Sequence, residues 1–405
     1  MGKSALTLLL LCLVAGEIHA QSLFEGAVEF YKRANEIDTM YVEPKKYSFK
    51  VQANYTQTQE ELRMKSDNGQ ELKYRSHISH KLRPALGVEC LSGSFGFSLG
   101  ATQVSDCEGQ AVDAKKTEIG LNLYTPMLNI DLFYRETGDD FQMVRCNMPF
   151  ASYINDPIME SFSNVQGLTS VKRIGGNAFY VFNHRKFSYP AAMTSACVQR
   201  RSAGSALAGI GYSNCEIKTE FNDYLFLTET VLAVFEEWIR AEDPERADEL
   251  HEYRFNPSES RLFNKLQYKD FTLWGGYAYN WVPMRNMLVS LSATVGLGYK
   301  TQKADNSGSM MSEPGVLEDL GYQSKLLSEI NTHMFDFNFV GRGSVQYNNG
   351  KWFAGTRFVY NYFNYHRGDE TLRTDNMFWN WRLYAGFRFG NRDKVKGWFK
   401  KKLKR

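Results

Sequence analysis

Past its first 20 residues, the chain contains no run of 18 or more apolar residues, the length that a membrane-spanning helix needs. A nucleophile elbow of the form Gly-x-Ser-x-Gly is also missing, because Gly204 and Ser205 stand in the wrong spacing. Neither sign of charge is in large excess, since 48 Lys and Arg face 45 Asp and Glu for a net charge of +3. The sequence therefore predicts no membrane helix, offers no local hydrolase signature and gives no charge argument for nucleic-acid binding.

Cysteine is scarce, and its spacing matches no metal-ligand pattern. Five cysteines lie beyond the first 20 residues, and in an oxidising compartment five allow at most two disulfides and leave one thiol over. We interpret these residues as structural, with their pairing open, and predict no metal site and no cofactor. The five cysteines beyond the first 20 residues are Cys90, Cys107, Cys146, Cys197 and Cys215.

The N-terminus has the pattern of a secretory signal peptide. Lys3 precedes an almost entirely apolar stretch at 5–15, and Ile18 and Ala20 occupy the −3 and −1 positions of a cleavage site before Gln21. The alternative, a membrane anchor, is disfavoured because the stretch is too short to cross ~30 Å of hydrocarbon. We predict cleavage and export without lipoprotein processing, since position 21 is not Cys.

What the chain does have is aromatics, with 28 Phe, 23 Tyr and 7 Trp, arranged with a period of two. The clearest case is 287–300, where apolar side chains alternate with Ser290, Ser292, Thr294, Gly296, Gly298 and Lys300. Such alternation over more than ten residues exceeds the usual strand of a soluble sandwich and is typical of a strand between lipid and a wet lumen. The apolar face is Met287, Val289, Leu291, Ala293, Val295, Leu297 and Tyr299.

The same pattern recurs along the chain, most clearly at 328–347 and 377–390, and many of the strands end in Trp or Tyr, as at a membrane interface. We predict an all-β fold, a transmembrane antiparallel up-and-down β-barrel of about 12 strands, with 10 or 14 as alternatives. Arg83-Pro84 is interpreted as a kink within one strand. The predicted strands are 47–57, 71–91, 94–102, 116–125, 127–136, 176–186, 203–213, 267–281, 286–300, 328–347, 351–366 and 377–390.

This strand assignment makes the connections alternate in length, as expected with periplasmic turns and longer extracellular loops. Only 187–202 is long for a turn. The predicted organisation is a signal peptide at 1–20, an N-terminal periplasmic segment at 21–46, a barrel at 47–390 and a basic periplasmic tail at 391–405. The tail is interpreted equally as a lipid-headgroup contact or a solvated segment. Extracellular insertions are expected near 137–175, 214–266 and 301–327, with an amphipathic helix at 223–240 in the second.

Candidate chemistry lies on the predicted inner face. His77 and His80 are three residues apart in one strand and are expected on opposite faces, so no catalytic residues are assigned and enzymatic activity stays uncertain. The charged lumen could attract an anionic small solute, or it could be salt-bridged and plugged, which the small size of a 12-strand barrel favours. The lumen-facing binding candidates are Arg342, Arg357, Arg382, Arg388 and Asp270, with Glu118 and Asp131 facing the same space.

Several stretches resemble an uncharacterised domain-of-unknown-function family, number forty-four twenty-one, of Gram-negative outer-membrane β-barrel proteins. The specific part is Phe-Ser-Tyr-Pro-Ala-Ala at 187–192 and Gln-Arg-Arg-Ser-Ala-Gly-Ser at 199–205. More generic strand motifs are Phe-Tyr-Val-Phe-Asn at 179–183, Gly-Tyr-Ala-Tyr at 276–279 and Gly-Phe-Arg-Phe-Gly at 386–390. The resemblance implies an outer-membrane barrel and attaches no activity or ligand.

The sequence thus predicts an integral protein of the Gram-negative cell outer membrane with a structural, binding or solute-passage role. The alternatives are a membrane-embedded hydrolase acting on lipid or peptide, and a soluble secreted β-protein. Expected partners are outer-membrane lipids, the barrel assembly machinery during biogenesis and an anionic small solute, with no nucleic acid.

Overall fold

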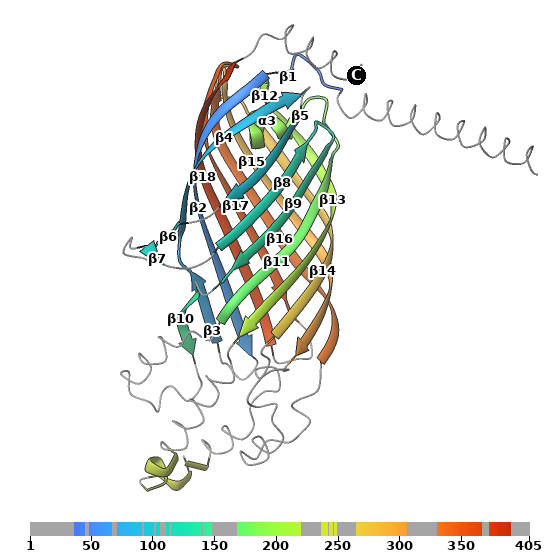
Figure 1. Ribbon diagram of the computed structural model, residues 1–405. Coiled ribbons are helices and arrows are strands. Elements are labelled where there is room, and N and C mark those ends of the chain that lie inside the picture. The colour runs from blue at the N-terminus through green and yellow to red at the C-terminus, as the bar shows by residue number, and fades with distance from the viewer. Residues whose placement is uncertain are drawn as a thin grey trace, which may run out of the picture.

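The computed structural model describes residues 36–44, 48–66, 71–90, 93–100, 103–105, 111–112, 116–138, 141–147, 168–219, 236–241, 243–245, 247–248, 265–305, 330–366 and 372–389. These residues form an all-β protein, in which one large antiparallel sheet curls around an interior (Figure 1). The predicted signal peptide and basic tail lie outside the described residues, as do most of the predicted insertions.

Each predicted strand range overlaps a strand or pair of strands in the structure. The long strands are β2 (Ser48–Ser66), β4 (Ser79–Cys90), β5 (Gly93–Gly100), β8 (Lys116–Tyr124), β9 (Leu128–Thr137), β11 (Leu168–Val181), β13 (Ala203–Thr219), β14 (Lys265–Trp281), β15 (Met287–Asp305), β16 (Ile330–Asn348), β17 (Trp352–Tyr365) and β18 (Leu372–Phe389). Shorter elements are β1 (Val42–Pro44), β3 (Glu71–Ser76), β6 (Gln103–Ser105), β7 (Ala111–Val112), β10 (Phe141–Asn147), α3 (Tyr189–Thr194) and β12 (Cys197–Gln199).

Neighbouring strands pair in a simple up-and-down order from β8 through β9, β11, β13, β14, β15, β16 and β17 to β18. The first long strand, β2, pairs with the last, β18, along its whole length. Its other edge pairs with β3 and β4, and β4 joins β5 through the pairs Glu89–Ser94 and Cys90–Gly93. β2 therefore lies between β18 on one side and β3 and β4 on the other.

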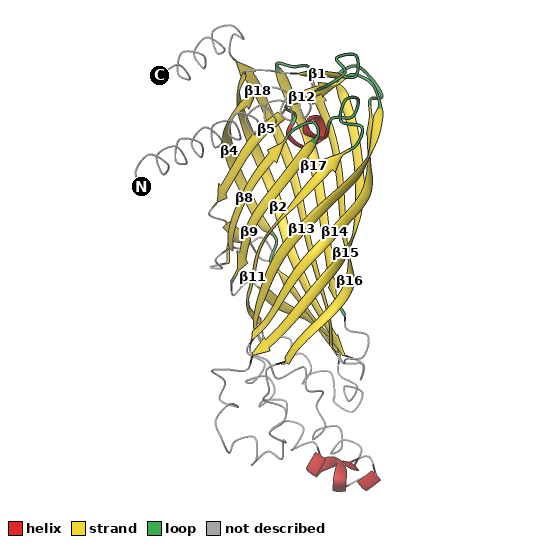
Figure 2. Cartoon of the chain, turned by 90° about the vertical axis from the view of Figure 1, so that its right-hand side faces the viewer, coloured by secondary structure: helices red, strands yellow, loops and turns green. Residues whose placement is uncertain are grey.

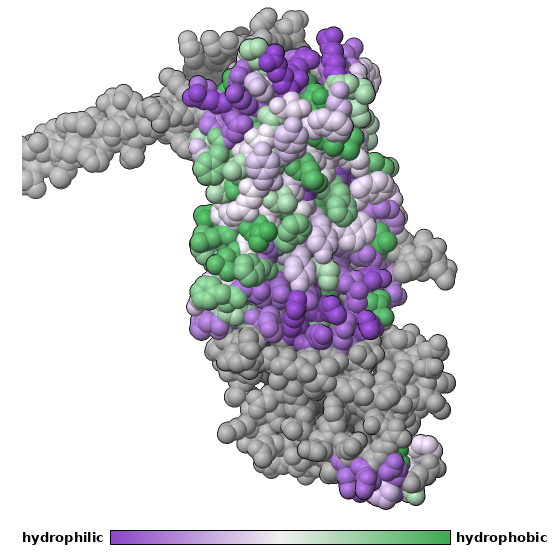
Figure 3. All heavy atoms as spheres, turned by 180° about the vertical axis from the view of Figure 1, so that it is seen from behind, coloured by the Kyte–Doolittle hydropathy of each residue, from purple (hydrophilic) through white to green (hydrophobic). Residues whose placement is uncertain are grey.

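Side chains on this sheet are sorted in the opposite way to a water-soluble protein. Phe335 and Leu291 are each 70% exposed on the outer face, although burying such a side chain is worth about 1.5–3 kcal/mol in water. Figure 3 shows hydrophobic residues over the middle of one face and hydrophilic residues toward its two ends. The inner face buries small and polar side chains, among them Thr58, Ser205, Thr272, Ser290, Ser292, Thr294, Asn338, Ser344 and Gln346.

The predicted alternation at 287–300 is confirmed, because Leu291, Val295 and Leu297 are exposed whereas Ser290, Ser292, Thr294 and Lys300 are buried. Several strands also run further than predicted. β15 continues to Asp305 and β13 to Thr219, while β11 begins at Leu168. Backbone ladder bonds continue where the apolar pattern stops, so hydropathy alone places these strand ends too early.

The single strand predicted at 71–91 is wrong, because it is interrupted, although not at Arg83-Pro84. Both residues lie in the continuous β2–β4 pairing, opposite Asn54 and Ala53. The interruption falls earlier, at 77–78, between β3 and β4. There the β2–β3 register ends at Glu61–Arg75 and the β2–β4 register begins at Thr58–Ser79, so one strand has an extra residue, as in a β-bulge.

All described short connections gather at one end of the sheet, which we call the turn end (Figures 1 and 2). They are 125–127, 282–286 and 349–351, together with the longer segment 182–202. The opposite end, from which the long insertions leave, is called the loop end. Of the helix predicted at 223–240, only 236–240 are described and these are helical, with an ion pair between Glu236 and Arg240 at 2.9 Å. The rest lies outside the described residues.

Candidate functional site: the plugged interior

Residues 187–199 fold back into the turn end of the sheet, and we call this segment the plug. Its short helix α3 is surrounded by strands in Figure 2. Phe187, Ala191, Ala192 and Cys197 are fully buried. The long turn expected at 187–202 therefore does not run over the surface but fills the interior.

Local chemistry shapes the plug. The Ser188 hydroxyl caps the first turn of α3 by accepting a hydrogen bond from the Ala191 backbone N–H at 3.1 Å, and Pro190 follows at a position that needs no backbone donor. Ser195 ends the helix in the left-handed conformation, with φ of 57°. A helix of 6 residues is not stable in water alone, so α3 depends on what surrounds it.

Side chains of the sheet hold the plug by donating hydrogen bonds to its backbone carbonyls. Asn348 donates to the carbonyls of Ser195 at 3.1 Å and Cys197 at 3.2 Å. Arg388 also donates to the Ser195 carbonyl, and Ser344 donates to Ala192 at 3.1 Å. Three further donors are Gln346 to Ala191, Asn280 to Ser188 and Lys50 to Thr194. Carbonyls that a helix end leaves unpaired are thus satisfied by strands on several sides.

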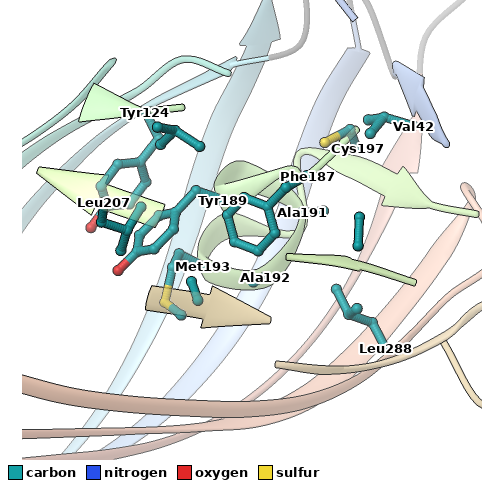
Figure 4. Close-up of a cluster of buried hydrophobic side chains, with 13 residues drawn as sticks. Val42, Tyr124, Phe187, Tyr189, Ala191, Ala192, Met193, Cys197, Leu207 and Leu288 are labelled. Atoms are coloured by element: carbon teal, nitrogen blue, oxygen red, sulfur yellow. The ribbon is translucent and has the colours of Figure 1, made fainter. Parts of the chain in front are cut away.

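An apolar cluster seals the space around α3 (Figure 4). Tyr189 packs edge-on against Tyr124 with ring centroids 5.9 Å apart, and Phe187 lies 6.2 Å from Tyr189. The rest of the cluster comes from the plug and from strands all around it, including Val181, Met193, Leu207, Ala278 and Leu288. The described side chains around the helix are therefore closely packed and mostly apolar.

Residues 36–44, which precede the large sheet in the chain, form a second layer over the plug. β1 pairs with β12, and the Arg200 backbone N–H donates to the Tyr41 carbonyl at 2.6 Å. Ion pairs join Arg200 to Glu43 and Arg185 to Glu36, the latter at 2.8 Å. Residues 36–44, part of the predicted N-terminal segment, thus form a strap across the turn end.

Next to the plug, the structure brings together three of the predicted binding candidates on adjacent strands. Arg357 on β17 lies directly opposite Arg382 on β18, and Arg342 on β16 lies one diagonal step away, two residues from Ser344, the partner of Arg357. Arg342 contacts Asp131 at 3.7 Å, and Asp131 also accepts a hydrogen bond from the Tyr124 hydroxyl. We call Arg342, Arg357 and Arg382 the arginine triad.

The other two predicted candidates lie elsewhere. Arg388 belongs to the plug contacts described above. Asp270 is deep in the interior, 3.8 Å from the Lys300 ammonium, and accepts a hydrogen bond from Asn338 at 2.8 Å. Asn338 in turn donates to Thr272 at 2.8 Å, so the group is a hydrogen-bonded network across neighbouring strands.

Among the buried cations that were not predicted as candidates is Arg173. Arg173 on β11 is 2% exposed, donates to the Tyr365 hydroxyl at 3.1 Å and lies over the Phe363 ring at 4.1 Å. The strand predicted from the sequence begins at 176 and therefore leaves Arg173 outside it. The alternation does continue upstream, because Val171, Arg173 and Asn177 lie on the same, inner face. These contacts cross the interior nearer the loop end, whereas the plug lies at the turn end.

Catalytic groups do not converge in the part of the chain that the structure describes. Ser188 Oγ lies 2.9 Å from Cys197 Sγ, but both are buried within the plug. His80 contacts Tyr55 at 2.7 Å, and no group of three or more His, Cys, Asp and Glu among the described residues could hold a metal ion. Cys197 and Cys215 form no disulfide within the described part of the chain, and the remaining cysteine side chains lie outside it. No described helix is long and apolar enough to cross a membrane.

Residues 36–389 match the family described as "Domain of unknown function (DUF4421)". No curated protein matches the chain. Among solved structures, the outer membrane protease OmpT from Escherichia coli is similar with a TM-score of 0.32 and 7% identity, covering 86% of this chain and 98% of that one. The P. putida toluene transporter TodX is similar with a TM-score of 0.25 and 10% identity, covering 87% of this chain and 94% of that one. Ail of Yersinia pestis is similar with a TM-score of 0.19 and 11% identity, covering 85% of this chain and 99% of that one.

Proposed function

The chain belongs to the DUF4421 family, and for this member we propose a closed outer-membrane β-barrel with a role in binding or in gated passage, not an open pore. The turn end faces the periplasm in this proposal, and the loop end faces the outside. The predicted cleavage of residues 1–20 delivers the chain to that membrane.

The inverted surface supports a membrane location. Apolar and aromatic side chains on the outer face and polar side chains on the inner face are what a lipid-facing wall around a wet interior requires. In water the same surface would expose a large apolar area and aggregate. The inverted sorting therefore favours the membrane protein over the soluble secreted alternative.

The strand pairings support closure into a barrel of twelve strands. Starting from β2, the pairings pass through β18, β17, β16, β15, β14, β13, β11, β9, β8, β5 and β4 and return to β2. With an even number of strands, the first strand begins and the last strand ends on the side of the short turns, as in bacterial single-chain barrels. Closure also removes the unpaired sheet edges that lipid does not tolerate.

The plug is the observation that carries the proposed closed state. A side chain of β14 donates a hydrogen bond to the plug backbone, and a side chain of β15 belongs to the apolar cluster around it. Donors from β16 and β18 hold the Ser195 carbonyl. A solute entering from the loop end meets this packed segment and the strap of residues 36–44. Binding, or passage that requires the plug to move, fits this geometry better than free diffusion.

Planar-bilayer conductance of protein purified from outer membranes tests the proposal. The wild type should show heat-modifiable gel mobility, as a folded barrel does, without steady conductance. The double variant N348A/R388A removes two wall contacts to Ser195 and should produce openings. The matched control N361A removes an inward-facing Asn that bonds Phe378 in the wall, away from the plug, and should stay closed.

Steady wild-type conductance would contradict the closed state while keeping the barrel. A protein that never enters membranes would contradict both. No contact among the described residues favours the hydrolase alternative, so it stays a prediction from the sequence.

A further inference from the structure

The arginine triad places like charges where a sheet normally avoids them. Arg357 and Arg382 are directly opposite each other on adjacent antiparallel strands, on the inner face. Side chains so placed have Cβ atoms about 4.5–5.5 Å apart, and like charges there repel. Arg342 adds a third guanidinium from the next strand.

Neighbouring groups leave single donor nitrogens of Arg342 and Arg357 without a hydrogen-bond partner. The contact between Arg342 and Asp131, at 3.7 Å, is longer than a good charge-assisted hydrogen bond, and Arg342 Nη1 is buried without a hydrogen-bond partner. Arg357 forms no ion pair with any described residue, its Nε has no partner, and its guanidinium lies over the Tyr384 ring at 5.4 Å. Buried cationic donors left unpaired are costly, so a fold that keeps them has a use for them.

The triad can be reached from within the interior. Arg342 is 8% exposed, whereas Arg357 and Arg382 are only half-buried although they point inward. Tyr384, on which Arg357 lies, donates to Gln346 at 2.9 Å, and Gln346 holds the plug. A ligand at the triad would therefore lie directly beside the plug.

We propose that the arginine triad binds a small oxyanion with phosphate-like or sulfate-like chemistry. The planar guanidinium fork matches such oxygens in pairs, and three forks from three adjacent strands can surround one ion. The ion would separate Arg357 from Arg382 and give Arg342 Nη1 an acceptor. The site goes beyond the closed-barrel proposal and does not depend on it.

Thermal unfolding of the full-length protein in detergent tests the site, with inorganic phosphate or sulfate compared with chloride at equal ionic strength. Phosphate or sulfate at a large excess over Kd should raise the wild-type Tm by a few degrees, because only the folded state has the site. R357Q should lose that rise. Its Tm in chloride should equal or exceed that of the wild type, because the repulsion with Arg382 is removed, an outcome that a purely structural arginine would not give.

The matched control is R373Q, which removes an arginine from the neighbouring strand β18, where Arg373 pairs with Asp375 away from the triad. It should keep the full response to phosphate and sulfate. No rise in the wild type, or an equal rise in R357Q, would overturn the site. If R357Q does not fold, R357K decides, because a weakened response supports the site and an unchanged one refutes it. Bilayer conductance tests the closed state separately, so either proposal can fail without the other.

Discussion

At the scale of single residues, the interior depends on small side chains that leave room for large ones. Gly355 on β17 lies opposite Tyr384, and a Cβ added there would be 2.8 Å from the Tyr384 hydroxyl and 2.6 Å from the Val345 carbonyl. The same hydroxyl bonds Gln346, which in turn bonds the plug. The sequence shows an inward Gly at this position, but not that a tyrosine from the next strand fills its space.

We expect G355A to destabilise the folded barrel by about 1–3 kcal/mol, because the added methyl overlaps backbone that cannot move away. G275A is the matched control, since its Cβ would meet nothing within 4 Å, and it should be close to neutral. Urea unfolding in detergent, followed by heat-modifiable mobility, measures both. Equal stability of the two variants would show that the contact with Tyr384 does not constrain the fold.

At the scale of elements, the plug is a segment whose structure comes from its surroundings. α3 is too short to persist alone, and the wall supplies partners for the carbonyls of Ser188, Ala191, Ala192, Thr194, Ser195 and Cys197. Cys197 is fully buried there, which makes its thiol a reporter of plug displacement.

We expect the N348A/R388A variant to react with a maleimide at Cys197 on the order of tenfold faster than the wild type or more, because loss of the two donors raises the population of the released plug. Peptide mapping by mass spectrometry measures the modification. Cys215, buried in the wall on β13, is an internal control and should keep its rate, as should Cys197 in N361A. If both thiols speed up together, the variant has loosened the whole barrel and the plug is not an independent element.

At the scale of the whole molecule, the face drawn in Figure 3 carries hydrophobic residues over its middle and hydrophilic residues toward its two ends, as the proposed membrane location requires. β15 shows this in one strand, because the exposed Val295 and Leu297 lie in its middle and the polar stretch 300–305 follows toward the loop end. A chain with this surface has its lowest free energy only when a bilayer covers the middle.

In liposomes, V295R should therefore destabilise the barrel by about 2–4 kcal/mol, whereas T301R, on the same strand and beyond the apolar stretch, should cost about 0–1 kcal/mol. Urea unfolding of the reconstituted proteins gives both values. A soluble protein would tolerate V295R as well as T301R, so equal effects would contradict the membrane location.

Much of this architecture follows from the sequence alone. A period of two is a local property of extended chain, so residues such as Leu291 and Ser292 reveal both a strand and its two faces without knowledge of their neighbours. The inward placement of Arg342, Arg357, Arg382, Arg388 and Asp270 was predictable on the same basis. The bulge at 77–78 was not, because it is defined only against the register of β2.

Only the tertiary structure shows which residues on the inner face contact one another. The segment 182–202 looks like a long turn because its partners Asn280, Ser344, Gln346, Asn348 and Arg388 lie about 90 to 190 residues further along the chain. The pairing of Arg357 with Arg382 likewise depends on register between strands, which alternation leaves open in steps of two residues. Local pattern fixed where strands form and which way they face, and long-range pairing fixed the plug and the arginine triad.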